Sequence, residues 1–335
     1  MNATKIKGSL LEYIVRRLLI NCGFTKVKPD NKYIFNDRGL NFIHGKGAAH
    51  DADVLMNPPI QMPFSYPFRI NFECKAYNKK VGLTVIRNAL GLRYDINELE
   101  ILTEYQLELR KNLRRTSKAV TNRIRFNYQV GVASVEHFTK DAFEFAANNK
   151  IPLISLKWLF PDNICNLFHE ITDQYLNNKF TEEEKSNLLL FLKGHNQYNH
   201  TFIYEINSHI STIINSVSEF EQRIIIGLLE SGDMIFLFSD TDIDRQYFLE
   251  TRTINARYYF YAEEINLWTI QLNNDLKLKF YLPDSIVKIW EELNFEIREA
   301  LNLKERLFGK LFIFPGNPTF KIINLDENWL NNARQ

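Results

Sequence analysis

Three charged residues at the ends of two short apolar runs are the residues of this chain best suited to chemistry. Asp53 directly precedes one run, and Glu73 and Lys75 end the other, which covers residues 68–75. Strand alternation places Glu73 and Lys75 on one face and turns Cys74 to the opposite, packed face. Charges at the end of an apolar strand are costly unless they are paired or used, so we expect a functional site here.

The types of these residues suit hydrolysis assisted by a metal ion. Two carboxylates, Asp53 and Glu73, are the oxygen ligands that Mg²⁺ prefers, with Mn²⁺ as the alternative ion. Lys75 could orient or deprotonate an attacking water, or stabilise charge that develops on a phosphate. Glu12, on a helix that precedes both strands, could reach the same point as a further metal ligand. Read alone, Glu12 is better explained by a surface pair with Arg16 at i+4.

Further residues could contact a nucleic-acid backbone. His50 lies three positions before Asp53 and could touch a phosphate or a metal-bound water, or only stabilise a turn. Seven cations with no acid occupy the stretch from Arg110 to Arg125, which suits phosphate contact as well as a solvated helix face. The candidates for nucleic-acid binding are His50, Arg110, Lys111, Arg114, Arg115 and Lys118.

Length and charge predict two domains, 1–160 and 161–335. The chain has 335 residues and a net charge of +1, but residues 1–160 carry 25 Lys and Arg against 14 Asp and Glu, and the remainder carries 16 against 26. A basic half suits a polyanion, while the acidic half suits a protein partner, a second copy of the chain or a small molecule. Three cysteines without metal or disulfide spacing, and the absence of any long apolar run, indicate a cytoplasmic protein that does not span a membrane.

The pattern of elements predicts an α/β sandwich with a mixed central sheet, followed by an α+β domain. Helix periodicity covers 7–21, ending at Gly23, and the two charged strands are joined by a loop at 57–67 that holds four prolines. The remaining expected elements are helices at 83–99, 100–125, 139–149, 163–193, 208–229 and 284–302, and strands at 128–135, 151–156, 234–238, 256–261, 276–281, 311–314 and 319–323.

The order of these segments resembles the PD-(D/E)xK nuclease superfamily and, more narrowly, the Mrr-like restriction endonucleases. Asp53, nineteen intervening residues and then Glu73-Cys74-Lys75 match the motif, except that Ala52 stands where the family has a proline. Four further features strengthen the resemblance, which covers about residues 5–157. They are the helix with Glu12, the lead-in 47–54 with its histidine, the helix at 81–91, and the closing strand, helix and strand at 131–154.

The resemblance implies a restriction-endonuclease-like α/β sandwich that cuts DNA with Mg²⁺. Asp53, Glu73 and the helix-borne Glu12 would be metal ligands, and Lys75 the catalytic lysine. The implied role is an endodeoxyribonuclease in restriction or antiphage defence. The alternatives are a structure-specific resolvase or RNA-cutting nuclease on the same fold, and a nucleic-acid-binding module that has lost activity.

Overall fold

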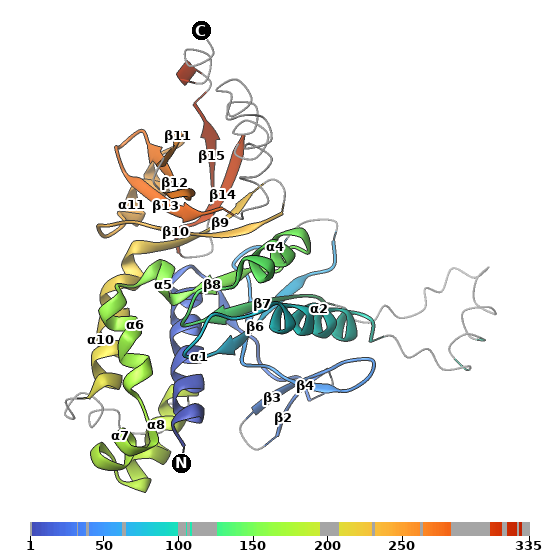
Figure 1. Ribbon diagram of the computed structural model, residues 1–335. Helices are drawn as coiled ribbons and strands as arrows, with labels where there is room; N and C mark the ends of the chain where they lie inside the picture. Colours follow the sequence, from blue (N-terminus) through green and yellow to red (C-terminus); the bar gives the residue numbers. More distant parts are fainter. Residues whose placement is uncertain are drawn as a thin grey trace.

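The computed structural model describes residues 2–31, 33–37, 40–61, 65–99, 105, 108, 126–194, 208–229, 232–261, 264–282, 309–316, 320–326, 328 and 329 (Figure 1). The helices are α1 (Ala3–Asn21), α2 (Leu83–Asn97), α4 (Lys140–Asn148), α5 (Leu156–Leu159), α6 (Asp162–Glu170), α7 (Asp173–Lys179), α8 (Glu182–Leu192), α10 (His209–Phe220), the 3₁₀ turn η1 (Glu221–Arg223) and α11 (Arg245–Glu250). The strands are β1 (Thr25–Lys26), β2 (Ile34–Asp37), β3 (Leu40–His44), β4 (Ala49–Asp51), β5 (Val54–Asn57), β6 (Phe68–Lys75), β7 (Asn127–Ser134), β8 (Leu153–Ser155), β9 (Ile224–Leu229), β10 (Met234–Phe238), β11 (Ile254–Tyr261), β12 (Glu264–Leu272), β13 (Lys277–Tyr281), β14 (Lys310–Phe314) and β15 (Lys321–Leu325).

A mixed sheet lies between helices in the N-terminal half. In the described residues its strand order is β1-β5-β6-β7-β8, with β5 antiparallel to β6 and with β6, β7 and β8 parallel. The side chains of one face pack against α1, and those of the other pack against α2 and α4. Figure 1 shows β6 and β7 between α1 and α2. The predicted α/β class with a mixed sheet is confirmed.

Helix α1 forms as its sequence predicts. The Asn2 side chain caps it by accepting a hydrogen bond from the backbone N–H of Lys5, and Gly23 follows the helix at a φ of 88°, which favours glycine. The apolar stripe that includes Leu11 and Leu18 is buried against the sheet. The helix therefore carries its polar edge, including Glu12, along the end of the sheet.

A second, three-stranded sheet of order β2-β3-β4 leads into the site. Strand β4 ends at Asp51, and the backbone N–H of Ala52 still donates to the carbonyl of Asn41 in the neighbouring strand β3. The next residues enter β5, which belongs to the central sheet. Asp53 therefore lies where the chain passes from one sheet to the other.

The helices that follow residue 160 pack on α1. Apolar side chains of α6, α8 and α10 join the same buried cluster as α1 and the central sheet. The predicted helix at 208–229 is wrong in its second half, because α10 ends at Phe220 and residues 224–229 form β9. The predicted domain boundary near residue 160 stays a prediction.

The C-terminal strands close into a barrel. Seven strands of the described chain follow one another in the order β10-β13-β12-β11-β15-β14-β9, and β9 pairs with β10 to complete the ring. Large side chains, among them Tyr258, Trp268 and Phe280, are buried in one cluster. The strands predicted between 234 and 323 are present, but their closure was not predicted. The expected helices at 100–125 and 284–302 lie almost wholly outside the described residues.

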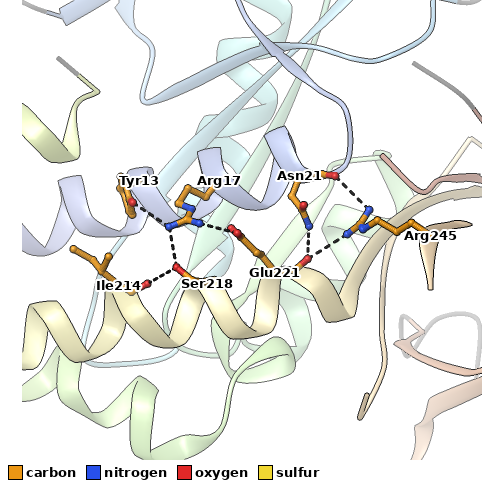
Figure 2. Close-up of polar contacts among 7 residues, drawn as sticks. All are labelled: Tyr13, Arg17, Asn21, Ile214, Ser218, Glu221 and Arg245. Carbon is orange, nitrogen blue, oxygen red and sulfur yellow. Dashed lines mark hydrogen bonds and ion pairs between the residues drawn. The ribbon is translucent and has the colours of Figure 1, made fainter. Parts of the chain in front are cut away.

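Polar contacts join α1 to α10, η1 and the barrel (Figure 2). The guanidinium of Arg17 pairs with the carboxylate of Glu221 at 2.7 Å. Arg245, at the start of α11, donates to the backbone carbonyls of Asn21 and Glu221 at 3.3 Å each, and to those of Ile224 and Pro315. The Asn21 amide also donates to the carbonyl of Glu221. One arginine thus gathers the carbonyls of three chain segments.

A second junction lies where the end of α4 and helix α5 meet the barrel. The Lys150 ammonium pairs with the Asp233 carboxylate at 2.6 Å. The ring of Trp158 stacks on that of Tyr281, with centroids 5.5 Å apart.

No helix in the described ranges combines the length and the apolar character needed to cross a membrane.

Candidate active site

The structure brings Asp53, Glu73 and Lys75 together at the end of the β5–β6 pair. Val54 is paired with Phe72 in antiparallel register, which places Asp53 opposite Glu73. A carboxylate oxygen of Asp53 accepts a hydrogen bond from the backbone N–H of Cys74 at 2.7 Å. The Lys75 ammonium donates to the Glu73 carboxylate at 3.1 Å, so these two side chains share a face as predicted.

Cys74 occupies the opposite face of β6. Its thiol is buried in the apolar cluster that joins the sheet to α1. Burial raises the pKa of this thiol, and the charges of Asp53 and Glu12 raise it further. The thiol therefore stays protonated and packs, as the sequence predicts, and it is not a nucleophile.

The pKa of the Asp53 carboxyl group is strongly perturbed. Burial raises its pKa to about 7, with added contributions from the negative charges of Glu73 and Glu12. The hydrogen bond from the Cys74 N–H and the charge of Lys75 act in the opposite direction. Perturbed carboxyl groups of this kind are concentrated at functional sites, since charge is held there at a cost in stability.

Lys75 is held in its charged form. Burial by itself lowers the pKa of Lys75, but the charges of Glu73 and Asp53 and the hydrogen bond to Glu73 outweigh burial, so the pKa is raised. A lysine in this state is protonated at neutral pH. It can donate hydrogen bonds and stabilise negative charge, and it does not accept a proton from water.

Glu12 joins the group from α1 through its charge. Burial raises its pKa, while the nearby cations Arg16 and Lys193 lower it in part. The charge of Asp51 acts on Glu12 as well. The sequence pair of Glu12 with Arg16 is thus present electrostatically, and Glu12 also acts on Asp53.

Two participants were missed from the sequence, Asp51 and Lys193. Burial raises the pKa of Asp51, with a further contribution from Glu73, and the charge of Lys193 opposes them. The spacing of Asp51 and Asp53 suggests a shared face, but this signal could not be used without knowing where the strand begins. Lys193 gives no local signal, because it reaches the site only through the packing of α8 beside α1.

His50 is tied to α2. Its imidazole Nε2 lies 2.6 Å from a carboxylate oxygen of Asp95, and Asp95 also accepts from the backbone N–H of Gly47. The hydrogen bond to His50 lowers the pKa of Asp95. Of the two readings of His50, this geometry favours the turn-stabilising one. The contact of His50 with a nucleic acid stays a prediction, and Arg110, Lys111, Arg114, Arg115 and Lys118 lie outside the described residues.

Asp53 and Glu73 form a donor set that suits a hard divalent cation. Both offer carboxylate oxygens from adjacent strands, and the negative charge of Glu73 raises the pKa of Asp53, which a bound cation would offset. Within the described ranges, no group of three or more His, Cys, Asp or Glu side chains is placed so that it could hold a metal ion. Waters or substrate oxygens would therefore complete the ligand set, as Mg²⁺ commonly requires. Glu12 as a third ligand stays a prediction.

Comparison with known proteins leaves the family of this chain open. No family model and no curated protein matches it. A solved structure described as the crystal structure of a protein of unknown function, AF1548, aligns with 62% of this chain and 78% of its own length. The identity is 14% and the TM-score is 0.29.

Proposed function

We propose that this protein is a metal-dependent endonuclease that hydrolyses DNA phosphodiester bonds on a restriction-endonuclease-like fold. The observation that carries the proposal is the placement of Asp53 opposite Glu73 with a protonated Lys75 hydrogen-bonded beside them. The PD-(D/E)xK motif supports it from the sequence. Restriction or antiphage defence, in the cytoplasm, is the role that we propose for such an enzyme.

Asp53 and Glu73 are the residues that would hold the cation. A bound Mg²⁺ supplies polarisation of the phosphate and a lower pKa for a coordinated water. The Cys74 N–H fixes one oxygen of Asp53 and leaves the other carboxylate oxygen available. The raised pKa of Asp53 means that the cation and a proton compete for this carboxylate near neutral pH.

Lys75 has a role that does not depend on the cation. As a half-buried ammonium held by Glu73, it can donate a hydrogen bond to a non-bridging phosphate oxygen and stabilise charge as it develops. Its charge also keeps the pKa of Asp53 lower than burial alone would set it. Deprotonation of water by Lys75 is disfavoured, because its pKa is raised.

The form of nucleic acid that is cut distinguishes the proposed endonuclease from a junction resolvase, an RNA-cutting nuclease and an inactive binding module. Purified protein would be incubated with supercoiled plasmid, linear duplex, single-stranded DNA, a four-way junction and RNA, each with Mg²⁺, Mn²⁺ or EDTA. We expect plasmid and linear duplex to be cut with Mg²⁺ or Mn²⁺ and to survive EDTA. Cleavage of RNA alone, or of junctions alone, would establish the rival nuclease functions. Binding without cleavage of any substrate would favour the inactive module.

A further inference from the structure

Three cations from three elements lie around the C-terminus of α8, and two of them, Lys26 and Arg16, come close together. Lys26 lies at the end of β1, Arg16 on α1, and Lys193 follows the last residue of α8. Gly194, the next residue, adopts a φ of 83°, and a Cβ built on it would lie 2.9 Å from the Lys26 ammonium and 3.4 Å from a guanidinium nitrogen of Arg16. Both cationic groups therefore point to the same place beside the end of α8.

This arrangement is unfavourable for the free protein. The pKa of Lys26 is lowered, first by burial and then by the charge of Arg16. Burial lowers the pKa of Arg16 too, and Glu12 offsets part of that effect. No carboxylate of the described chain acts on Lys26 in compensation. Like charges that are brought together and partly desolvated mark a place where an anion would be stabilised.

The carbonyls at the C-terminus of α8 explain only part of the cluster. Arg16 donates to the carbonyl of Leu192 at 2.9 Å, which is a normal way to satisfy the last turn of a helix. The end of a helix is equivalent to about half a negative charge. Glu12 and Asp51 lie within charge range of Arg16 or Lys193, so Lys26 is the cation that stays without a compensating charge. For Lys26 and Lys193, no hydrogen-bond acceptor is found in the part of the chain that the structure describes.

The cluster adjoins the candidate active site without being part of it. Lys193 acts on the charges of both Glu12 and Asp51, and Glu12 acts in turn on Asp53. The basic residues at the end of α8 are thus coupled by charge to the acidic residues around Asp53. A phosphodiester chain needs both kinds of contact, since one phosphate is cleaved while its neighbours are held.

We propose that Lys26, Arg16 and Lys193 form a phosphate-binding subsite that holds a backbone phosphate of the nucleic-acid substrate next to the one that is cut. The naming of a nucleic acid rests on the proposed function, while the anion site itself rests on the cluster. Lys193 gives the helical segment after residue 160 a direct part in substrate binding.

The test measures binding under conditions that need no turnover. Affinity for a fluorescent DNA duplex would be measured in Ca²⁺ over a series of salt concentrations, with the DNA checked for integrity afterwards. The variants are Lys26→Met, Lys193→Met and the double variant, and the matched control is Lys179→Met, an exposed lysine at the end of α7. We expect each single variant to weaken binding about tenfold, the size of one charge-assisted hydrogen bond. The slope of log Kd against log salt should fall by roughly 0.9 for each phosphate that a variant no longer neutralises, and the control should match wild type.

Three further readouts decide the outcome. The melting temperature separates a role of Lys26 in binding from a role in capping the end of α8. If Lys26 binds the substrate and only repels Arg16 in the free protein, Lys26→Met should have an unchanged or higher melting temperature. Lower stability with unchanged DNA affinity and salt slope would overturn the proposal. Titration with inorganic phosphate forms a separate arm, and Lys26-dependent binding of free phosphate without DNA binding would overturn the nucleic-acid assignment. Lys26-dependent DNA binding by a protein that cuts nothing would keep the subsite and reject only the nuclease activity.

Discussion

The carboxylate of Asp53 accepts a hydrogen bond from the backbone N–H of Cys74 at 2.7 Å, so an acid that begins one strand is fixed against the strand that carries Glu73 and Lys75. This bond crosses between antiparallel neighbours and aligns two carboxylates that repel each other. The buried thiol of Cys74 anchors the same residue to the apolar cluster under α1. Packing on one face of β6 thereby sets the position of charged groups on the other.

Ionisation of Asp53 should make the free energy of unfolding depend on pH, and this can be measured without any substrate. Its pKa is about 7 in the folded chain against an ordinary value of 3.8. The stabilising contribution of its protonated form is complete below about 3.8 and is lost as pH rises through 7. We therefore expect Asp53→Asn to be more stable than wild type at pH 8, by on the order of a few kcal/mol, and equal to it near pH 4.

Urea unfolding at several pH values without divalent ions measures this difference. Saturating Mg²⁺ should reduce it at pH 8, because only wild type gains stability from binding the ion. An Asp53→Asn protein that is less stable than wild type at pH 8, or a difference that does not vary with pH, would contradict the origin that we assign to the raised pKa.

Lys75 should act as a fixed cation. We expect Lys75→Met to lower kcat by about 100- to 1,000-fold, the usual cost of removing one donor to developing charge. Loss of its charge should also raise the pKa of Asp53, so the acidic limb of the rate profile should move to higher pH. Rates measured with Mg²⁺ between pH 6 and 9 test both effects. A wild-type rate that keeps rising with pH up to pH 9, with this rise lost in Lys75→Met, would show instead that neutral Lys75 removes a proton.

His50 and Asp95 should behave as a structural pair. Their contact of 2.6 Å is about one quarter exposed on each side, so its removal should cost about 0.5 to 1 kcal/mol in the free energy of unfolding. We expect His50→Ala, Asp95→Ala and the double variant to lose similar stability and similar activity. A much larger loss of activity in His50→Ala than in Asp95→Ala would mean that the imidazole contacts the substrate.

Arg245 should be essential for joining α1 to the barrel. A lysine cannot reproduce the fork of donors that meets the carbonyls of Asn21, Glu221, Ile224 and Pro315, so Arg245→Lys removes several of these partly buried hydrogen bonds at once. We expect a loss of about 2 to 4 kcal/mol in unfolding free energy. The exposed Arg252→Lys provides the matched control in urea denaturation. Equal stability of the two variants would show that these hydrogen bonds contribute little.

Local periodicity predicted most of the N-terminal half. Alternation in residues 68–75 placed Glu73 and Lys75 together and Cys74 on the packed face, because side-chain direction in a strand depends only on sequence position. The start of the Asp53 strand could not be predicted, since the chain changes sheets at Ala52 through a bond to Asn41. Long-range pairing of this kind leaves no local pattern.

The C-terminal half shows the same limit on a larger scale. The sequence predicts a helix over residues 224–229, but the β-branched residues of this run form β9, which pairs with both β10 and β14. Barrel closure depends on that pairing and on the parallel contact of β11 with β15. Lys26 and Arg16 are likewise brought together beside Gly194 only by tertiary packing, and Lys26 alone is typical of a surface lysine.

The initial rate of plasmid cleavage is the most direct measure of the proposed active site. It would be compared for wild type, Asp53→Asn and Asp37→Asn, the last removing an exposed acid at the end of β2 as the matched control. We predict Mg²⁺-dependent cleavage by wild type and by Asp37→Asn, abolition by EDTA, and a loss of at least about 1,000-fold in Asp53→Asn. Cleavage by Asp53→Asn at the wild-type rate, or wild-type cleavage that persists in EDTA, would contradict a metal-dependent centre at Asp53 and Glu73.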